Sequence, residues 1–263
     1  MTGRGALAAL AWLGTAGAAT QEEIVTLPSA DAATVSYVRG WEDSARPKAA
    51  AVLFTGGEGR VGLATRGIPR PGANFLVRTR GVFNRQGVAT AVIDVPSDLN
   101  EMPDSIRMSA RHAADVAAVV KDMKRRFAGV PVYLVGTSRG TVSAAYAGAA
   151  LGTDIAGVVL TSSLFNATRT GPGISGFDYA KLESKLLFVH HADDACFATP
   201  YHMAESVSAG YPLTTVRGGN PAKSGPCDPY SPHGFFGVEG PTVRAITGWM
   251  LSGQAPATVG EPR

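Results

Sequence analysis

The sequence predicts an α/β fold, a three-layer α/β/α sandwich in which helices cover both faces of a mostly parallel sheet. Short apolar runs alternate with longer segments of helical period along most of the 263 residues. Several of the short runs, such as 49–54, are continuously apolar, which is typical of strands buried on both faces. No shift in composition marks a boundary, so we expect residues 20–263 to form a single domain.

The order of the elements follows from their period and from the turn residues between them. Apolar residues recur at three- and four-residue steps most clearly over 105–127, which predicts one long helix there. The first two strands are separated by turn residues, and we expect them to form an antiparallel edge of the sheet. The tail 252–263 is polar, contains Pro and Gly, and is expected to be frayed. Strands are expected at 24–27, 34–38, 49–54, 88–95, 130–135, 155–160, 185–190 and 213–216, and helices at 75–86, 105–127, 141–150, 200–209 and 242–251.

Composition excludes several classes of partner. Apolar residues make up 45% of the chain and charged residues 17%, with a net charge of +3, which suits a globular protein with a sizeable core. No basic block with interleaved aromatic residues is present, so we expect no nucleic-acid partner. No stretch is long and apolar enough to predict stable membrane insertion, and nothing in the sequence predicts an oligomeric state.

The first 19 residues have the pattern of a signal peptide. Arg4 supplies a positive charge, an apolar run follows at 6–13, and the small residues 16–18 form a cleavage site. We therefore predict export, to the periplasm or outside the cell. The alternative is a cytoplasmic protein with an alanine-rich first helix.

Two cysteines, Cys196 and Cys227, are present. One pair in an exported chain predicts one disulfide, which would stabilise the fold by roughly 3–4 kcal/mol. The alternative is two separate buried thiols.

The central motif is Gly-Thr-Ser-Arg-Gly at 136–140. It follows the apolar run 130–135 and precedes a run of small residues at 141–150, which predicts strand, sharp turn and helix. At such a turn Ser138 is exposed to an incoming carbonyl group, and the two glycines avoid a clash between strand and helix. The pattern favours Ser138 as a nucleophile; an ordinary glycine-rich turn is the alternative.

A serine nucleophile needs a base that is oriented by a third group. In an open parallel sheet these groups gather at the carboxyl ends of strands. Two adjacent carboxylates, Asp193 and Asp194, follow the strand expected at 185–190, and we favour Asp194. His233 lies between the last expected strand and the last expected helix, and we predict that it is the base.

The other histidines are expected to be structural because they lie inside elements or beside the acid. None of the histidines has partners at the spacing of a zinc motif, so we expect no metal site. These other histidines are His112, His190, His191 and His202.

Negative charge on a reacting carbonyl oxygen is stabilised by backbone N–H groups. One should come from Arg139, the residue after the nucleophile. The other should come from the glycine-rich loop after Phe54, where Gly57 is the best placed. A plain glycine-rich turn is the alternative for this loop.

Together these residues resemble the α/β-hydrolase superfamily over essentially the whole expected mature chain. The segment 136–140 resembles its nucleophile elbow, 55–57 its oxyanion loop, 190–194 its acid loop, and His233 its late histidine. Thr55 and His191 stand where His and Gly are common in the family, and the elbow serine differs from the cysteine of dienelactone hydrolases.

The resemblance implies the fold and a catalytic triad of Ser138, Asp194 and His233, with no cofactor. It also gives the cysteines a role, because a disulfide between Cys196 and Cys227 would tie the acid loop to the base loop.

We therefore predict a serine hydrolase that cleaves carboxylic esters through an acyl-enzyme. The interval 162–184, where relatives often insert a cap, is short, so small or short-acyl esters are expected. Phe165, Phe177 and Tyr179 are candidates to line the site, but for each of them we favour packing in the core or at the surface. Thioesterase, amidase or peptidase activity with the same triad is an alternative, as is a hydrolase-fold binding protein without activity.

Overall fold

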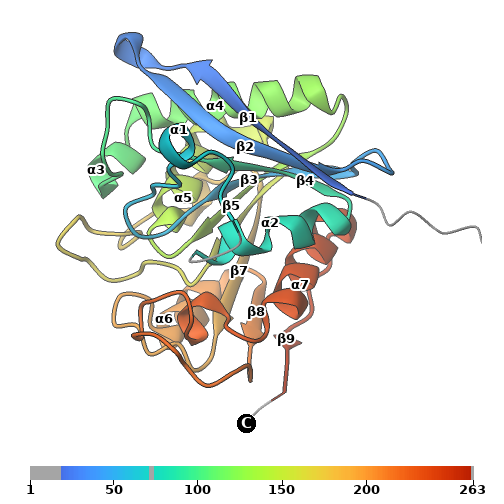
Figure 1. The fold of residues 1–263 in the computed structure, drawn as a ribbon. Helices are drawn as coiled ribbons and strands as arrows, with labels where there is room; N and C mark the ends of the chain where they lie inside the picture. The colour runs from blue at the N-terminus through green and yellow to red at the C-terminus, as the bar shows by residue number, and fades with distance from the viewer. Residues whose placement is uncertain (1–18, 71–73, 262–263) are drawn as a thin grey trace, which may run out of the picture.

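The structure, a computed structural model, describes residues 19–70 and 74–261. Within these residues nine strands lie in one sheet, in the order β1-β2-β4-β3-β5-β6-β7-β8-β9 (Figure 1). The strands are β1 (Thr20–Pro28), β2 (Thr34–Glu42), β3 (Ala49–Phe54), β4 (Val88–Ile93), β5 (Val132–Thr137), β6 (Gly157–Thr161), β7 (Lys185–His191), β8 (Leu213–Val216) and β9 (Thr258–Val259).

The strand directions confirm a mostly parallel sheet with an antiparallel edge. β1 pairs antiparallel with β2, and β2 pairs antiparallel with β4. Every pairing from β4 through β3 to β9 is parallel. β3, β4, β5 and β6 are buried along their whole length, as their continuous apolar sequence predicts.

Helices cover both faces of the sheet, which confirms the three layers (Figure 1). Successive residues of a strand point to opposite faces, so Val52 packs in the core beneath α4 and α5, while Leu53 packs in the core beneath α2 and α7. The helices are α1 (Leu63–Arg66), α2 (Phe75–Arg85), α3 (Asp104–Arg107), α4 (Ala110–Arg126), α5 (Gly140–Leu151), α6 (Tyr201–Val207) and α7 (Glu239–Ser252).

The prediction of a single helix over 105–127 is wrong. The segment divides into α3 and α4, and Ser109 lies between them as the N-cap of α4. The Ser109 hydroxyl accepts the His112 N–H at 3.2 Å, which satisfies a donor that has no partner inside the helix. A serine after one helical turn therefore begins a new helix instead of continuing the first.

The expectation of a frayed tail is wrong at 258–259. Thr258 and Val259 form β9 alongside β8, and the Arg217 N–H donates to the Val259 carbonyl at 2.9 Å. The predicted signal peptide, in contrast, lies almost wholly outside the described residues. Among the helices that the structure describes, none has the length and apolar character needed to cross a bilayer.

Candidate active site

Ser138 occupies a sharp turn between β5 and α5. Its φ of 53° lies in the left-handed region, which is unusual for a residue with a side chain, and its N–H donates to the Thr161 carbonyl at 3.0 Å. The flanking glycines are required, because a Cβ at Gly140 would lie 2.1 Å from the Phe54 carbonyl oxygen, and one at Gly136 would lie 2.4 Å from the Gly140 oxygen. The backbone thus presents Ser138 at the carboxyl end of the sheet, as the motif predicts.

Asp194 follows β7 and is buried, whereas Asp193 is exposed. One carboxylate oxygen, Oδ2, lies 3.0 Å from His233 Nδ1 and accepts the Thr199 hydroxyl at 2.8 Å. The other oxygen accepts the Cys196 N–H at 3.0 Å. The structure therefore brings Asp194, and not Asp193, to the histidine.

His233 lies in a single turn of 3₁₀ helix, Pro232–Gly234, and is buried. The bond from Nδ1 to the Asp194 carboxylate requires the proton on Nδ1, so Nε2 is left as a hydrogen-bond acceptor. The Ser162 hydroxyl donates to the His233 carbonyl at 2.8 Å and fixes the backbone of this turn. Thr199 Oγ1 lies 3.1 Å from Nδ1, so it contacts both partners of the pair.

Thr199 and Ser162 were not anticipated. Neither belongs to a motif, and each reaches the site only through the folding of its loop. Only proximity in sequence could have indicated Thr199, which lies five residues after Asp194 in the same loop.

Ser138 and His233 line the same pocket, which has a volume of about 240 Å³. Their side chains are not joined by a hydrogen bond in this structure, although both residues are described. Gly56 forms the wall beside the serine, because a Cβ there would lie only 2.9 Å from Ser138 Cβ.

The loop after β3 is shaped to present an N–H group. Gly57 has a φ of 58°, and the Gly56 carbonyl accepts the Gly59 N–H at 3.1 Å, which turns the Gly56–Gly57 peptide. The Gly57 carbonyl accepts from the guanidinium groups of Arg139, at 3.3 Å, and Arg107, at 3.4 Å. Gly57 lines the pocket of Ser138, and Arg139 follows Ser138 in the chain; that their N–H groups form an oxyanion hole stays a prediction.

Arg107 also supports this loop and was not anticipated from the sequence. It is buried, and its guanidinium donates to the Met102 carbonyl and to the Ser143 hydroxyl, both at 2.9 Å. The pKa of Arg107 is lowered to about 9, mainly by burial and also by the charge of Arg139, while the charge of Asp104 acts in the opposite direction.

Comparison with known proteins bears on the fold. No protein-family model and no curated protein matches the sequence. Solved structures do match, although only 13–15% of aligned residues are identical. The chain has the α/β-hydrolase fold.

Three of these structures illustrate the likeness. A dienelactone hydrolase from Anabaena variabilis has a TM-score of 0.59 and 14% identity, over 88% of this chain and 97% of that one. A cold-adapted esterase from an Arctic intertidal metagenomic library has a TM-score of 0.53 and 15% identity, over 74% and 84%. A serine hydrolase without a lid from Xanthomonas campestris has a TM-score of 0.51 and 13% identity, over 74% and 83%. Identity at this level establishes the fold alone.

Within this hydrolase fold, Cys196 and Cys227 form a disulfide, as predicted. Cys196 lies in the loop of Asp194, and Cys227 lines the pocket of Ser138 in the segment before His233. The bond therefore joins the loop of Asp194 to the segment that precedes His233.

The remaining histidines do not line the pocket of Ser138. His190 is buried, its Nε2 accepts the Ser163 N–H at 3.0 Å, and burial lowers its pKa to about 3. His112 lies in α4, where burial lowers its pKa to about 3, with a smaller contribution from the charge of Arg107. Both are neutral near pH 7, which suits structural roles.

Phe165, Phe177 and Tyr179 have the packing role that we favoured over lining the pocket. Phe165 stacks on His190 at a centroid distance of 5.4 Å, and Tyr179 contacts Phe177 and the core residue Phe188. All three rings pack in or against the core beneath α5 and not in the pocket of Ser138.

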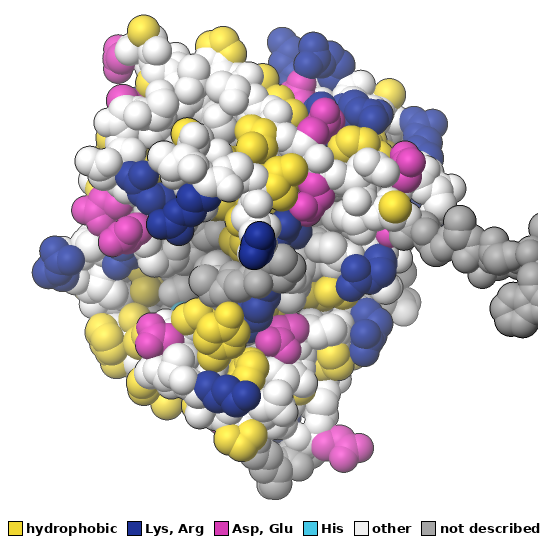
Figure 2. Space-filling view, viewed as in Figure 1, with side chains coloured by type: hydrophobic (Ala, Val, Ile, Leu, Met, Phe, Trp, Pro, Cys, Tyr) yellow, Lys and Arg dark blue, Asp and Glu magenta, His cyan; other side chains and the backbone are white. Residues whose placement is uncertain are grey.

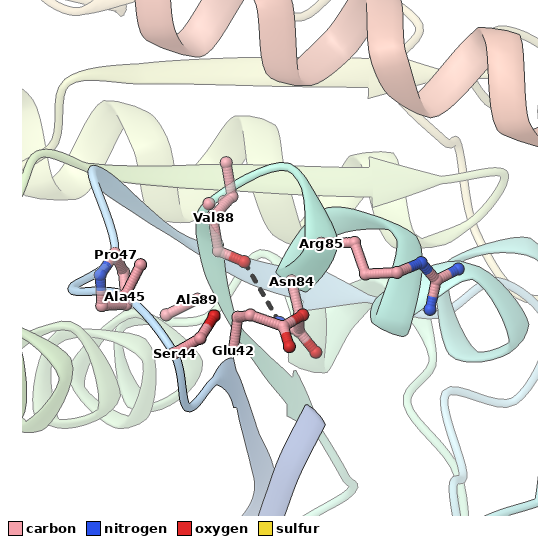
Figure 3. Close-up of a pocket in the computed structure, with 9 residues that line it drawn as sticks. Glu42, Ser44, Ala45, Pro47, Asn84, Arg85, Val88 and Ala89 are labelled. Carbon is pink, nitrogen blue, oxygen red and sulfur yellow. Dashed lines mark hydrogen bonds between the residues drawn. The ribbon is translucent and has the colours of Figure 1, made fainter. Parts of the chain in front are cut away.

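A second hollow lies at the amino ends of the central strands, opposite to the end where Ser138 lies (Figure 3). Its lining includes Glu42, Asn84 and Val88, and Asn84 Nδ2 donates to the Val88 carbonyl at 3.1 Å. Val88 begins β4, whereas Ser138 follows the end of the parallel strand β5. Ligand sites of such sheets form at the carboxyl ends, so this hollow is not the candidate active site. Over the described ranges, no group of three or more His, Cys, Asp or Glu side chains is arranged to hold a metal ion.

Proposed function

We propose that the protein is a serine hydrolase that cleaves carboxylic esters through an acyl-enzyme on Ser138. The observation that carries the proposal is the buried Asp194–His233 pair, whose histidine lines one pocket with a serine held at a positive φ. The α/β-hydrolase fold and its esterase neighbours support a hydrolytic activity, while the residue assignments depend on the geometry.

In the proposed mechanism, Ser138 Oγ attacks the carbonyl carbon and His233 Nε2 accepts its proton. Asp194 holds the proton on Nδ1 and stabilises the imidazolium that forms. Since Ser138 and His233 are not hydrogen-bonded in this structure, the serine side chain must rotate toward Nε2 when substrate binds. The N–H groups of Gly57 and Arg139 stabilise the oxyanion, and a water activated by His233 then releases the acid.

The short interval 162–184 supports small or short-acyl substrates. It contains no α-helix, only a 3₁₀ turn at Tyr179–Lys181 and an isolated bridge between Thr168 and Gly171. It therefore supplies no helical lid over the 240 Å³ pocket.

The disulfide supports export, because such bonds persist in oxidising compartments. We place the protein in the periplasm or outside the cell, with residues 20–263 acting as one domain. Thioester or amide cleavage by the same residues, or ligand binding without turnover, are the competing functions.

The test is labelling with a fluorophosphonate, which reacts with activated serines. The wild type and the exposed-serine control Ser175→Ala should be labelled, whereas Ser138→Ala should not. Ester, thioester and amide substrates with acetyl, butyryl and octanoyl groups would then rank the activities. Absence of labelling in folded wild type, with unchanged ligand binding by Ser138→Ala, would favour the binding protein; a preference for octanoyl esters would refute the short-acyl assignment.

A further inference from the structure

The segment between β3 and α2 is strongly basic. Residues 59–74 contain three arginines, Arg60, Arg66 and Arg70, and no Asp or Glu. All three line a pocket of about 530 Å³ whose lining contains no acidic residue. In Figure 2, several Lys and Arg side chains gather in the region of α1, which belongs to this segment.

This basic pocket adjoins the pocket of Ser138. Gly56 and Asn74 line both of them. A Cβ at Gly56 would lie 3.5 Å from Ser138 Oγ, so the boundary between the pockets is a glycine backbone in contact with the nucleophile. A ligand whose carbonyl group meets Ser138 can therefore extend past Gly56 toward the arginines.

The described part of this segment up to Arg70 is held in place at several points. Asp94 accepts the N–H groups of Val61, Gly62 and Leu63 at 2.7, 2.9 and 2.7 Å. Further along, the Arg80 guanidinium donates to the Pro69 carbonyl at 2.6 Å and pairs with Glu22. These bonds define the backbone that carries the arginines.

The positive charge of the pocket is not neutralised by the protein. Within the described residues, Arg66 and Arg70 form no ion pair. Arg60 donates from Nε to the Asn100 carbonyl at 2.9 Å, which leaves its charge without a counter-ion. The nearby carboxylate of Asp94 is occupied by the three backbone N–H groups.

We propose that the basic pocket is a subsite for an anionic oxygen group, such as a carboxylate, on the ester substrate. Guanidinium groups bind carboxylates through paired, charge-assisted hydrogen bonds, and two free arginines beside a reactive serine select substrates that carry this charge. The inference rests on the proposed function for the reaction, but the binding it predicts is measurable without turnover.

The experiment compares each of two anionic esters with its neutral methyl ester. The pairs are 4-acetoxybenzoate with methyl 4-acetoxybenzoate, and 4-nitrophenyl hydrogen adipate with its methyl ester. In at least one pair we expect kcat/KM of wild type to favour the anionic member by about tenfold or more, the scale of one hydrogen bond to a charged group. Arg66→Gln with Arg70→Gln should abolish this preference and leave the neutral ester within about twofold. Added salt should reduce the preference in the wild type.

The control is Arg85→Gln, which removes one positive charge from an exposed arginine beside the hollow at the amino ends of the strands, far from the basic pocket in the sheet. In neither ester pair should it change the ratio of kcat/KM for the anionic member to kcat/KM for the neutral member. Melting temperatures should show that all variants are folded. Equal activity on both members of both pairs, unchanged by the double substitution, would overturn the subsite.

If the wild type cleaves none of these esters, the proposed function fails while the subsite is still tested. Binding of 4-acetoxybenzoate and of 4-nitrophenyl hydrogen adipate to Ser138→Ala is measured by calorimetry. Binding that is lost on Arg66→Gln with Arg70→Gln supports the subsite, and binding that is absent or unaffected contradicts it.

Discussion

The two halves of the candidate site are constructed differently. Asp194 and His233 are held by side-chain hydrogen bonds, by Thr199 between them, and by the disulfide of their loops. Ser138 and the oxyanion loop are held by backbone conformations, with φ of 53° at Ser138 and 58° at Gly57. The acid–base half should therefore lose chemistry when a side chain changes, and the nucleophile half should lose its fold when a Cβ is added.

The largest expected effect is that of Asp194→Asn. An amide at this position no longer holds the proton on His233 Nδ1, so we expect kcat/KM to fall by about 10⁴-fold with a small change in melting temperature. Asp193→Asn is the matched control, since Asp193 is exposed and lies next in the chain. A greater loss of activity in the control would exchange the roles of the two aspartates.

Removal of the disulfide should have the next largest effect. For a bridge between residues 31 apart, we expect Cys196→Ser with Cys227→Ser to lower the free energy of unfolding by roughly 3–4 kcal/mol. Activity should also fall, because the bond joins the loops of Asp194 and His233. Urea unfolding and ester kinetics measure the two effects, and reductant should affect the wild type but not the double variant. Unchanged stability and activity in the double variant would show that the disulfide does not hold the two loops in position.

Gly140→Ala tests the nucleophile half. The added Cβ would lie 2.1 Å from the Phe54 oxygen, so we expect the free energy of unfolding to fall by about 3 kcal/mol. Gly248→Ala is the control within α7, where a Cβ meets nothing within 4 Å and should stabilise the helix by about 0.5–1 kcal/mol. If Gly140→Ala and Gly248→Ala changed the thermal stability equally, the turn at Ser138 would not depend on the absence of a Cβ at residue 140.

The smallest expected effect is a loss of stability in acid. His112 and His190 have pKa values lowered to about 3 by burial, against 6.5 in the unfolded chain. Between these pH values the unfolded chain binds more protons, so stability is fully present above pH 6.5 and falls as pH decreases toward 3.

At pH 5 each histidine should lower the free energy of unfolding by on the order of 2 kcal/mol. In His112→Leu, the free energy of unfolding measured by urea titration should therefore fall less between pH 7 and pH 5 than it does in the wild type. An equal loss of stability in the variant and the wild type would show that His112 does not cause the loss in acid.

Much of the fold follows from sequence because its signals are local. The apolar run 49–54 became β3 without change, and the strand at 213–216 became β8. Errors arose where a single hydrogen bond decided the outcome, as at the Ser109 cap, or where a distant partner did, as with β8 and the tail.

The candidate site divides in the same way. Chain order and motif predicted that Asp194 and His233 meet and that glycines surround Ser138. Thr199 and Arg107 were missed because neither belongs to a recognised motif. Thr199 lies close to Asp194 in the same loop, whereas Arg107 reaches the loop of Gly57 from the end of α3.

β9 has a practical consequence for shortened forms of the protein. The Thr215 and Arg217 N–H groups donate to the Ala257 and Val259 carbonyls at 2.9 Å, so this short terminal strand occupies one margin of the sheet. In a chain that ends at residue 255, these two N–H groups at β8 would lose their acceptors, beside apolar neighbours. Exposed strand margins of this kind recruit strands from other molecules. Trimming the apparently dispensable tail should therefore lower solubility before it affects turnover.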